Sequence, residues 1–169
     1  SDVRQLFLMY AVDFVNPAHL ANPLFDEAVE RYAPFKGTTA IDVIRHTKKV
    51  LEIVAILGGQ WPHSSYMVPG GVVSLPSSGD LVQCRQILTL YRKWYEKRIL
   101  GCSLDRWLAV RSAADLDAWL EESDSHRNSD TGFFIRFARG AGLDRIGCGH
   151  GHFLSFGCFD IPEGSAVSS

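Results

Sequence analysis

The stretch that decides how this chain is organised is Val54–Val73, with the sequence VAILGGQWPHSSYMVPGGVV. Glycine pairs lie near both ends, at Gly58-Gly59 and Gly70-Gly71, and His63 follows Pro62 between them. Glycine lets backbones approach closely, and proline stiffens the chain by fixing φ. We therefore expect this apolar connector to run between packed helices or against another chain, and not to be a floppy surface loop.

Two long amphipathic patterns flank the connector. Apolar residues recur at helical spacing over 40–57, Thr38 or Thr39 is the expected cap, and Gly58 predicts the end of that helix. After the connector, Ser77 or Ser78 is the expected cap of a helix over 79–100, which Gly101 ends. Shorter helical patterns lie at 3–15, 24–33, 103–110, 112–122 and 131–142.

Three further segments complete the prediction. The helix at 3–15 is expected to be largely buried, with Leu6, Met9, Tyr10 and Asp13 or Phe14 at helical spacing and Val3, Phe7 and Leu8 widening the apolar surface. The polar residues 123–130, SDSHRNSD, are typical of a loop. The glycine-rich segment from Ile146 alternates with a period of two, which predicts a strand or hairpin. The predicted fold class is mainly α (α+β), a helical bundle segment with a small β element near the C-terminus.

Composition limits the function classes. The chain has 169 residues and a net charge of −2, which argues against a nucleic-acid-binding surface. No apolar run is long enough to cross a bilayer, and the opening segment does not resemble a signal peptide. Four cysteines are too few for a disulfide scaffold of this size. We expect a cytoplasmic or peripherally membrane-associated protein with reduced thiols.

One group of residues has the chemistry of a metal site. Cys148, His150, His152 and Cys158 share the parity of a regular strand, and sulfur and imidazole ligands suit zinc or iron. The C-x-H-x-H spacing is uncommon in structural zinc sites. The alternative is a glycine-rich strand with buried cysteines and partly exposed histidines.

Other catalytic patterns are weak. His63 precedes Ser64 and Ser65, but sequence neighbours rarely form a nucleophile–base pair, and no G-x-S-x-G motif occurs. The glycine pairs fit no nucleotide-binding motif. His46, between Arg45 and Lys48, is interpreted as a solvated or core-edge histidine.

The connector nevertheless resembles one family. The order Gly58-Gly59, Pro62-His63, Gly70-Gly71 after a long helix is similar to the large subunit of nickel–iron hydrogenases, nearest to uptake or hydrogen-scavenging members. Three further segments also resemble that subunit: LFLMYAVDFV at 6–15, YRKWYEKRIL at 91–100 and the run from Thr131 to Asp160.

The resemblance implies a role in the oxidation and reversible heterolytic cleavage of H₂. In that family a Ni–Fe centre with CO and cyanide ligands is held by four cysteines in two CxxC motifs. Electrons pass to the Fe–S clusters of a small subunit. The expected partners are therefore that small subunit and the remaining parts of the large subunit, and the segment alone is expected to bind no cofactor.

This chain lacks the metal-binding motifs. No two of its cysteines are separated by two residues, so residues 1–169 are interpreted as a single partial domain from the middle of the large subunit. No catalytic residue is expected, and the isolated chain is expected to be inactive. The resemblance assigns Pro62, His63, Gly70 and Gly71 to the interface near the proximal cluster, where a histidine can tune a metal centre through a hydrogen bond. Two alternatives are a non-catalytic interaction or scaffold module of the same fold and the Cys/His zinc-binding module.

Overall fold

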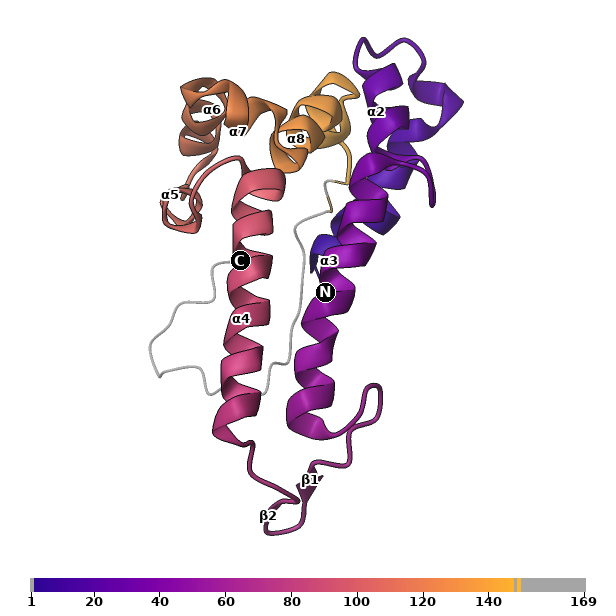
Figure 1. The fold of residues 1–169 in the computed structure, drawn as a ribbon. Coiled ribbons are helices and arrows are strands. Elements are labelled where there is room, and N and C mark those ends of the chain that lie inside the picture. The colour runs from indigo at the N-terminus through magenta and orange to yellow at the C-terminus, as the bar shows by residue number, and fades with distance from the viewer. Residues whose placement is uncertain (1, 148, 150–169) are drawn as a thin grey trace, which may run out of the picture.

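The computed structural model describes residues 2–147 and 149. Its described part is mainly helical, as predicted, and has two regions (Figure 1). Short helices gather at one end, and two long helices extend from them side by side. We call residues 44–94 the helical arm; it comprises most of α3 (Thr38–Gly58), the connector and α4 (Ser78–Trp94).

The N-terminal helical segment changes type along its length. Helix α1 (Asp2–Gln5) continues into a π-helical turn at Leu6–Tyr10 and a 3₁₀ segment at Ala11–Val15. Phe7 and Phe14 are buried, as expected, together with Ala11. The expected buried face was partly wrong: Leu6 is half-buried, and Met9 and Tyr10 are exposed.

A capped turn and a short helix lead into the first long helix. Asn16 caps a 3₁₀ turn at Pro17–His19, and α2 (Phe25–Tyr32) carries acidic residues in its first turn, where the helix dipole favours them. Gly37 is the N-cap of α3, which corrects the prediction that Thr38 or Thr39 caps it. Thr39 is instead fully buried.

Helix α4 begins and ends where the sequence predicts. Ser77 and Asp80 form a reciprocal capping box, which satisfies backbone N–H groups of the first turn. The helix continues as a π-helical segment, Tyr95–Leu100, and ends at Gly101 with φ +70°. Glycine is required here because a Cβ would overlap the carbonyl oxygen of Ser125.

The remaining helices fold back over this end of the molecule. They are α5 (Leu104–Leu108), α6 (Ala113–Glu122), α7 (Asp124–Asn128), α8 (Asp130–Gly140) and a 3₁₀ turn, Leu143–Arg145. The prediction of a loop over 123–130 was wrong. Serine side chains at 123 and 129 cap two consecutive helices, so a segment that looks like a polar loop is helical.

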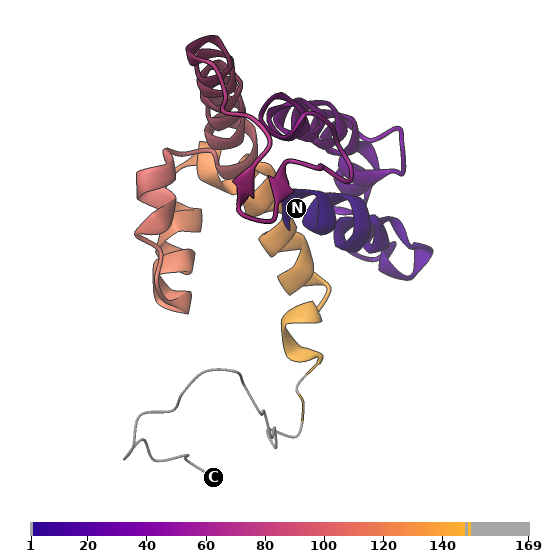
Figure 2. The ribbon, with the colours of Figure 1, turned by 90° about the horizontal axis from the view of Figure 1, so that it is seen from below.

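The short helices, which Figure 2 shows from below, are held together by an aromatic core. Phe14 stacks on Phe137 with ring centroids 4.3 Å apart, and Tyr32 lies 5.7 Å from Phe133. Phe7 contacts Tyr32 from the other side. Each such pair contributes about 0.5–1.5 kcal/mol beyond its buried area, so this cluster is the main stabilising centre.

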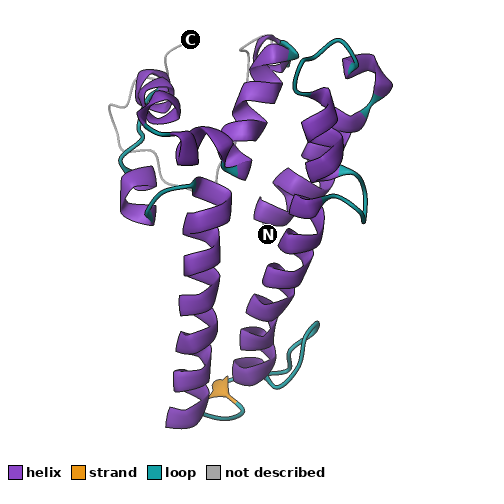
Figure 3. Ribbon diagram, turned by 45° about the horizontal axis from the view of Figure 1, so that its top comes forward, coloured by secondary structure: helices purple, strands orange, loops and turns teal. Residues whose placement is uncertain are grey.

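The β element lies in the connector, near the middle of the chain (Figure 3). Strands β1 (Met67–Val68) and β2 (Gly71–Val72) form an antiparallel hairpin, with Met67 opposite Val72. The prediction placed the β element near the C-terminus instead. Most of that segment, which begins at Ile146, lies outside the described residues.

Candidate functional site

The connector between α3 and α4 forms the tip of the helical arm. Helix α3 ends at Gly58, and Gly59 adopts φ +79°, which turns the chain away from the helix axis. A cis Trp61–Pro62 bond precedes His63, which has φ +63°. A left-handed backbone at a non-glycine residue is uncommon, and it turns the chain sharply at His63.

Hydrogen bonds within the connector hold this turn. The Gln60 side chain donates to the His63 carbonyl oxygen at 2.5 Å, and Ser64 Oγ donates to the Gly58 carbonyl oxygen at 2.8 Å. Ser64 Oγ also accepts from the backbone N–H of Tyr66 at 3.2 Å. The conformation around His63 is therefore supported by local bonds rather than by burial.

The second glycine pair serves the hairpin. Pro69 and Gly70 are the two central residues between the strands, and Gly70 has φ +91°. Proline followed by a residue with positive φ is the signature of a type II turn, in which glycine is favoured at the second position. The Val73 N–H donates to the Tyr66 carbonyl oxygen at 2.9 Å and extends the ladder.

The connector is exposed, which corrects the expectation that it runs between packed helices of this chain. Several of its large apolar side chains are exposed: Trp61 is 54% exposed, Met67 81% and Val73 65%. Pro62, His63, Gly70 and Gly71 are exposed as well. The sequence prediction of an interface to another chain is not tested by this geometry, but the exposure of these residues is compatible with it.

Two hollows flank the connector where it leaves α3. One, of about 270 Å³, is lined by Gly58, Gln60, Tyr66 and neighbouring residues. The other, of about 400 Å³, is mainly apolar and lies between Leu57 and Met67. Both are open, so they are features of a contact surface and not enclosed substrate cavities.

The chemistry near His63 is limited. Ser64 Oγ bonds the Gly58 carbonyl, so it is not held as a nucleophile by the histidine. Within residues 2–147 and 149, no three His, Cys, Asp or Glu side chains gather as a metal site. The predicted ligand set of Cys148, His150, His152 and Cys158 lies outside the described residues.

A buried ionic cluster, which the sequence did not reveal, lies between the short helices. Asp130 is completely buried; its Oδ1 accepts from Arg31 at 2.8 Å and from Thr39 Oγ1 at 2.7 Å. Arg98 Nε lies 3.0 Å from Oδ2, close but not aligned as a hydrogen bond. Helices α2, α3 and α8 and the π segment after α4 are thereby tied together.

Burial dominates the electrostatics of this cluster. Burial raises the pKa of the Asp130 carboxyl, although Arg98, Thr39 and Arg31 act in the opposite direction. Burial likewise raises the pKa of Tyr32 well above its ordinary value. The sequence carries a signal for the helix that begins with Asp130, although not for the cluster itself. Ser129 caps that helix, and a cap residue followed by an apolar run is typical of a helix start.

Comparisons with known proteins give no assignment. No known family model matches the sequence, and no curated protein matches it. Within the described residues, no helix is both long and apolar enough to span a membrane.

Proposed function

We propose that this chain is the central segment of a nickel–iron hydrogenase large subunit, supporting the reversible heterolytic cleavage of H₂. The observation that carries the proposal is the connector, with its order of glycine pairs and Pro62-His63 after a long helix. This order resembles the hydrogenase large subunit, and the exposed position of His63 at the arm's tip supports a contact role.

The proposed role of the connector is to meet the small subunit that carries the Fe–S clusters. Trp61, Met67 and Val73 offer exposed apolar contact area in the same connector as His63. Exposed apolar groups around a polar residue are typical of protein interfaces. The imidazole of His63 would then donate a hydrogen bond toward the proximal cluster, and Pro62 and the hairpin at Gly70-Gly71 would fix its position.

The residues of this chain do not fit a Ni–Fe centre by themselves. Cys84 is buried in the arm and Cys102 lies after the π segment, and neither belongs to a cysteine pair with CxxC spacing. The described residues also contain no cluster of metal-binding side chains. We therefore propose that the Ni–Fe centre with its CO and cyanide ligands is held by cysteines outside this chain.

A binding and metal-analysis experiment tests the proposal. The purified chain should capture a hydrogenase small subunit containing Fe–S clusters and should itself contain no stoichiometric nickel. His63→Ala should weaken small-subunit binding about tenfold, which corresponds to roughly 1.4 kcal/mol. Arg111→Ala, an exposed substitution remote from the connector, is the matched control and should leave binding unchanged.

The outcomes separate the alternatives. Stoichiometric nickel on this chain alone would contradict the proposal. Capture of partners without Fe–S clusters would favour a non-catalytic scaffold module, for which the exposed connector is equally suitable. Zinc that is retained by the chain and lost in Cys148→Ser would favour the Cys/His zinc-binding module.

A further inference from the structure

The helical arm buries very little of its own surface. Beyond Val43, no residue of α3 is fully buried, and in α4 only Cys84 is buried, within the part of the chain that the structure describes. Helices in proteins are stabilised mainly by packing of an apolar face. Two helices that pack only on each other are therefore an incomplete bundle.

Large apolar side chains remain exposed along α4. Val82 is 57% exposed, Leu88 51% and Leu90 67%. These positions lie outside the stripe that faces α3, where Cys84, Ile87 and Tyr91 are more buried. Leu90 also lines the groove that α4 forms with α3.

A groove between the two helices has one apolar wall and one basic wall. Its apolar wall is formed by residues of α4, and its basic wall by residues of α3. The α3–α4 groove, of about 370 Å³, is lined by Arg45, His46, Lys49, Ile87, Leu90 and Tyr91. This lining contains cationic side chains and no carboxylate.

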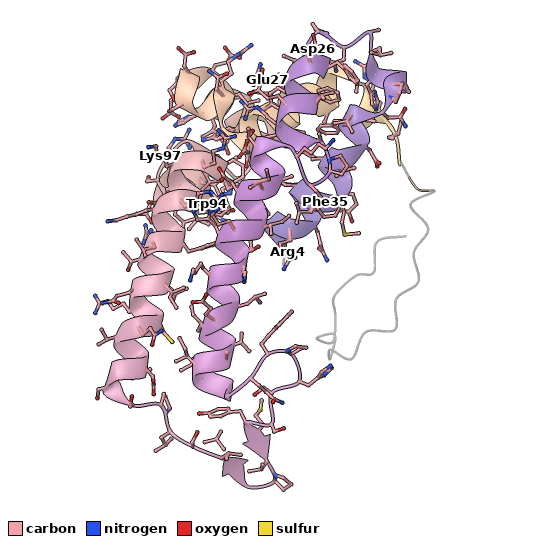
Figure 4. All side chains as sticks on the ribbon, turned by 45° about the vertical axis from the view of Figure 1, so that its right-hand side comes forward. Arg4, Asp26, Glu27, Phe35, Trp94 and Lys97 are labelled. Carbon is pink, nitrogen blue, oxygen red and sulfur yellow. The ribbon has the colours of Figure 1, made fainter. Side chains whose placement is uncertain are left out.

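The floor of the groove is ordered. His46 stacks on Trp94 with ring centroids 4.3 Å apart, and its Nδ1 lies 2.9 Å from the Asp42 carbonyl oxygen. Figure 4 shows Trp94 on α4 beside α3. Both rings are therefore held in place without a ligand, so ordering these two side chains adds little to the entropy cost of binding.

The cations at the rim are held only weakly. Arg45 pairs with Asp42 at 3.5 Å and Lys49 pairs with Glu52 at 2.9 Å, and both cationic side chains are about two-thirds exposed. Exposed pairs of this kind contribute about 0.2–1 kcal/mol, so both cations can turn to another carboxylate. Between Thr38 and Trp94 the sequence has six Lys and Arg but three Asp and Glu, whereas the whole chain has a net charge of −2.

We propose that the α3–α4 groove binds an acidic amphipathic helix of a partner polypeptide. Its apolar face would cover Ile87 and Leu90, and its carboxylates would face Arg45 and Lys49. A second copy of this chain is a poorer occupant, because it would bring two basic arms together. The inference goes beyond the proposed function: it concerns a different surface from the connector, and either proposal can fail without the other.

A peptide titration tests the proposal on the full chain. The probe is a synthetic amphipathic helix of about 18 residues, with leucines on one face and glutamates beside them. The comparison peptide has lysine at every glutamate position. By isothermal titration calorimetry, the acidic peptide should bind at least about tenfold more tightly than the basic one, with the difference falling at high salt.

Surface variants locate the binding site. Two variants should each weaken binding of the acidic peptide at least about tenfold. One is Leu90→Asp, and the other is the double variant Arg45→Glu with Lys49→Glu. Arg111→Glu makes a single charge reversal of the same kind away from the arm and should have no effect. Because these side chains are exposed or half-buried, thermal unfolding followed by circular dichroism should show that each variant stays folded.

Four results would overturn the proposal. Equal binding of the acidic and basic peptides would remove the electrostatic argument. Binding that survives Leu90→Asp would place the peptide elsewhere. A dimer in sedimentation that Leu90→Asp dissociates would make a second copy the occupant. Binding that appears only after deletion of residues 150–169 would make that segment the occupant.

Discussion

The aromatic core and the helical arm are built from similar helices but differ in what covers them. In the core, Phe14 and Phe137 are almost completely removed from solvent, whereas Leu88 and Leu90 in the arm are exposed by half or more. All four occupy helices or helical turns with a clear apolar pattern. The difference teaches that apolar periodicity identifies a face that needs a partner, but not whether this chain supplies the partner.

Truncating a large side chain should give the largest difference between the two regions. Phe137→Ala removes a ring that stacks on Phe14 at 4.3 Å, and it should lower the free energy of unfolding by about 3–5 kcal/mol. Leu88→Ala removes exposed surface and should change the free energy of unfolding by less than about 0.5 kcal/mol. Urea unfolding measures both. Equal losses would show that the arm is packed as the core is.

Glycine substitutions compare the connector with the end of the π-helical segment that follows α4. Gly101 and Gly59 both have positive φ, so alanine at either position should cost about 1–2 kcal/mol. Gly101→Ala should cost clearly more, because its Cβ would overlap the Ser125 carbonyl oxygen, while a Cβ at Gly59 meets nothing within 4 Å. Thermal unfolding of the two variants checks the order. A larger loss in Gly59→Ala would contradict it.

Threonine substitutions test the buried ionic cluster. Thr39→Val removes the hydroxyl that donates to Asp130 at 2.7 Å in the buried cluster, and should cost about 1–3 kcal/mol. Thr89→Val removes an exposed hydroxyl that donates to the Arg85 carbonyl oxygen, and should be neutral within about 0.5 kcal/mol. Urea unfolding distinguishes them. If Thr39→Val left the free energy of unfolding unchanged, this hydrogen bond would not be what holds the cluster together.

The smallest expected effect is the pH dependence of the α4 capping box. Hydrogen bonds from the Ser77 side chain and backbone lower the pKa of the Asp80 carboxyl. Because the pKa is lower in the folded state, the box stabilises the helix above the ordinary Asp pKa of about 3.9 and loses that contribution as the pH falls through the folded value.

An NMR titration of the Asp80 carboxyl carbon measures this effect. The midpoint should lie below that of the same residue in a short reference peptide. Ser77→Ala removes one donor and should move the midpoint back toward the peptide value. A midpoint that is the same in both proteins would show that the side-chain bond does not control the titration.

The candidate site was predicted in part. The glycine pairs and Pro62-His63 were correctly identified as a shaped connector, because turn geometry is a local property. Its exposure at the end of the arm was not predicted, since an apolar composition fits either burial or an interface. The Asp130 cluster was missed altogether, because its partners Arg31, Thr39 and Arg98 are distant in sequence.

The sequence by itself determined where helices begin and end. Of the two predicted cap residues Ser77 and Ser78, Ser77 caps α4, and Gly58 and Gly101 mark predicted helix ends. These features depend on side chains within a few residues of the backbone groups that they satisfy.

Only the tertiary structure decided which apolar faces are buried. Within the predicted helix at 3–15, Met9 is exposed while Phe7 is buried, and partners from three other segments enclose Asp130. Burial depends on neighbours supplied from elsewhere in the chain, which a local pattern does not encode. For the same reason the arm has an apolar face that the sequence predicted and that the described fold leaves open.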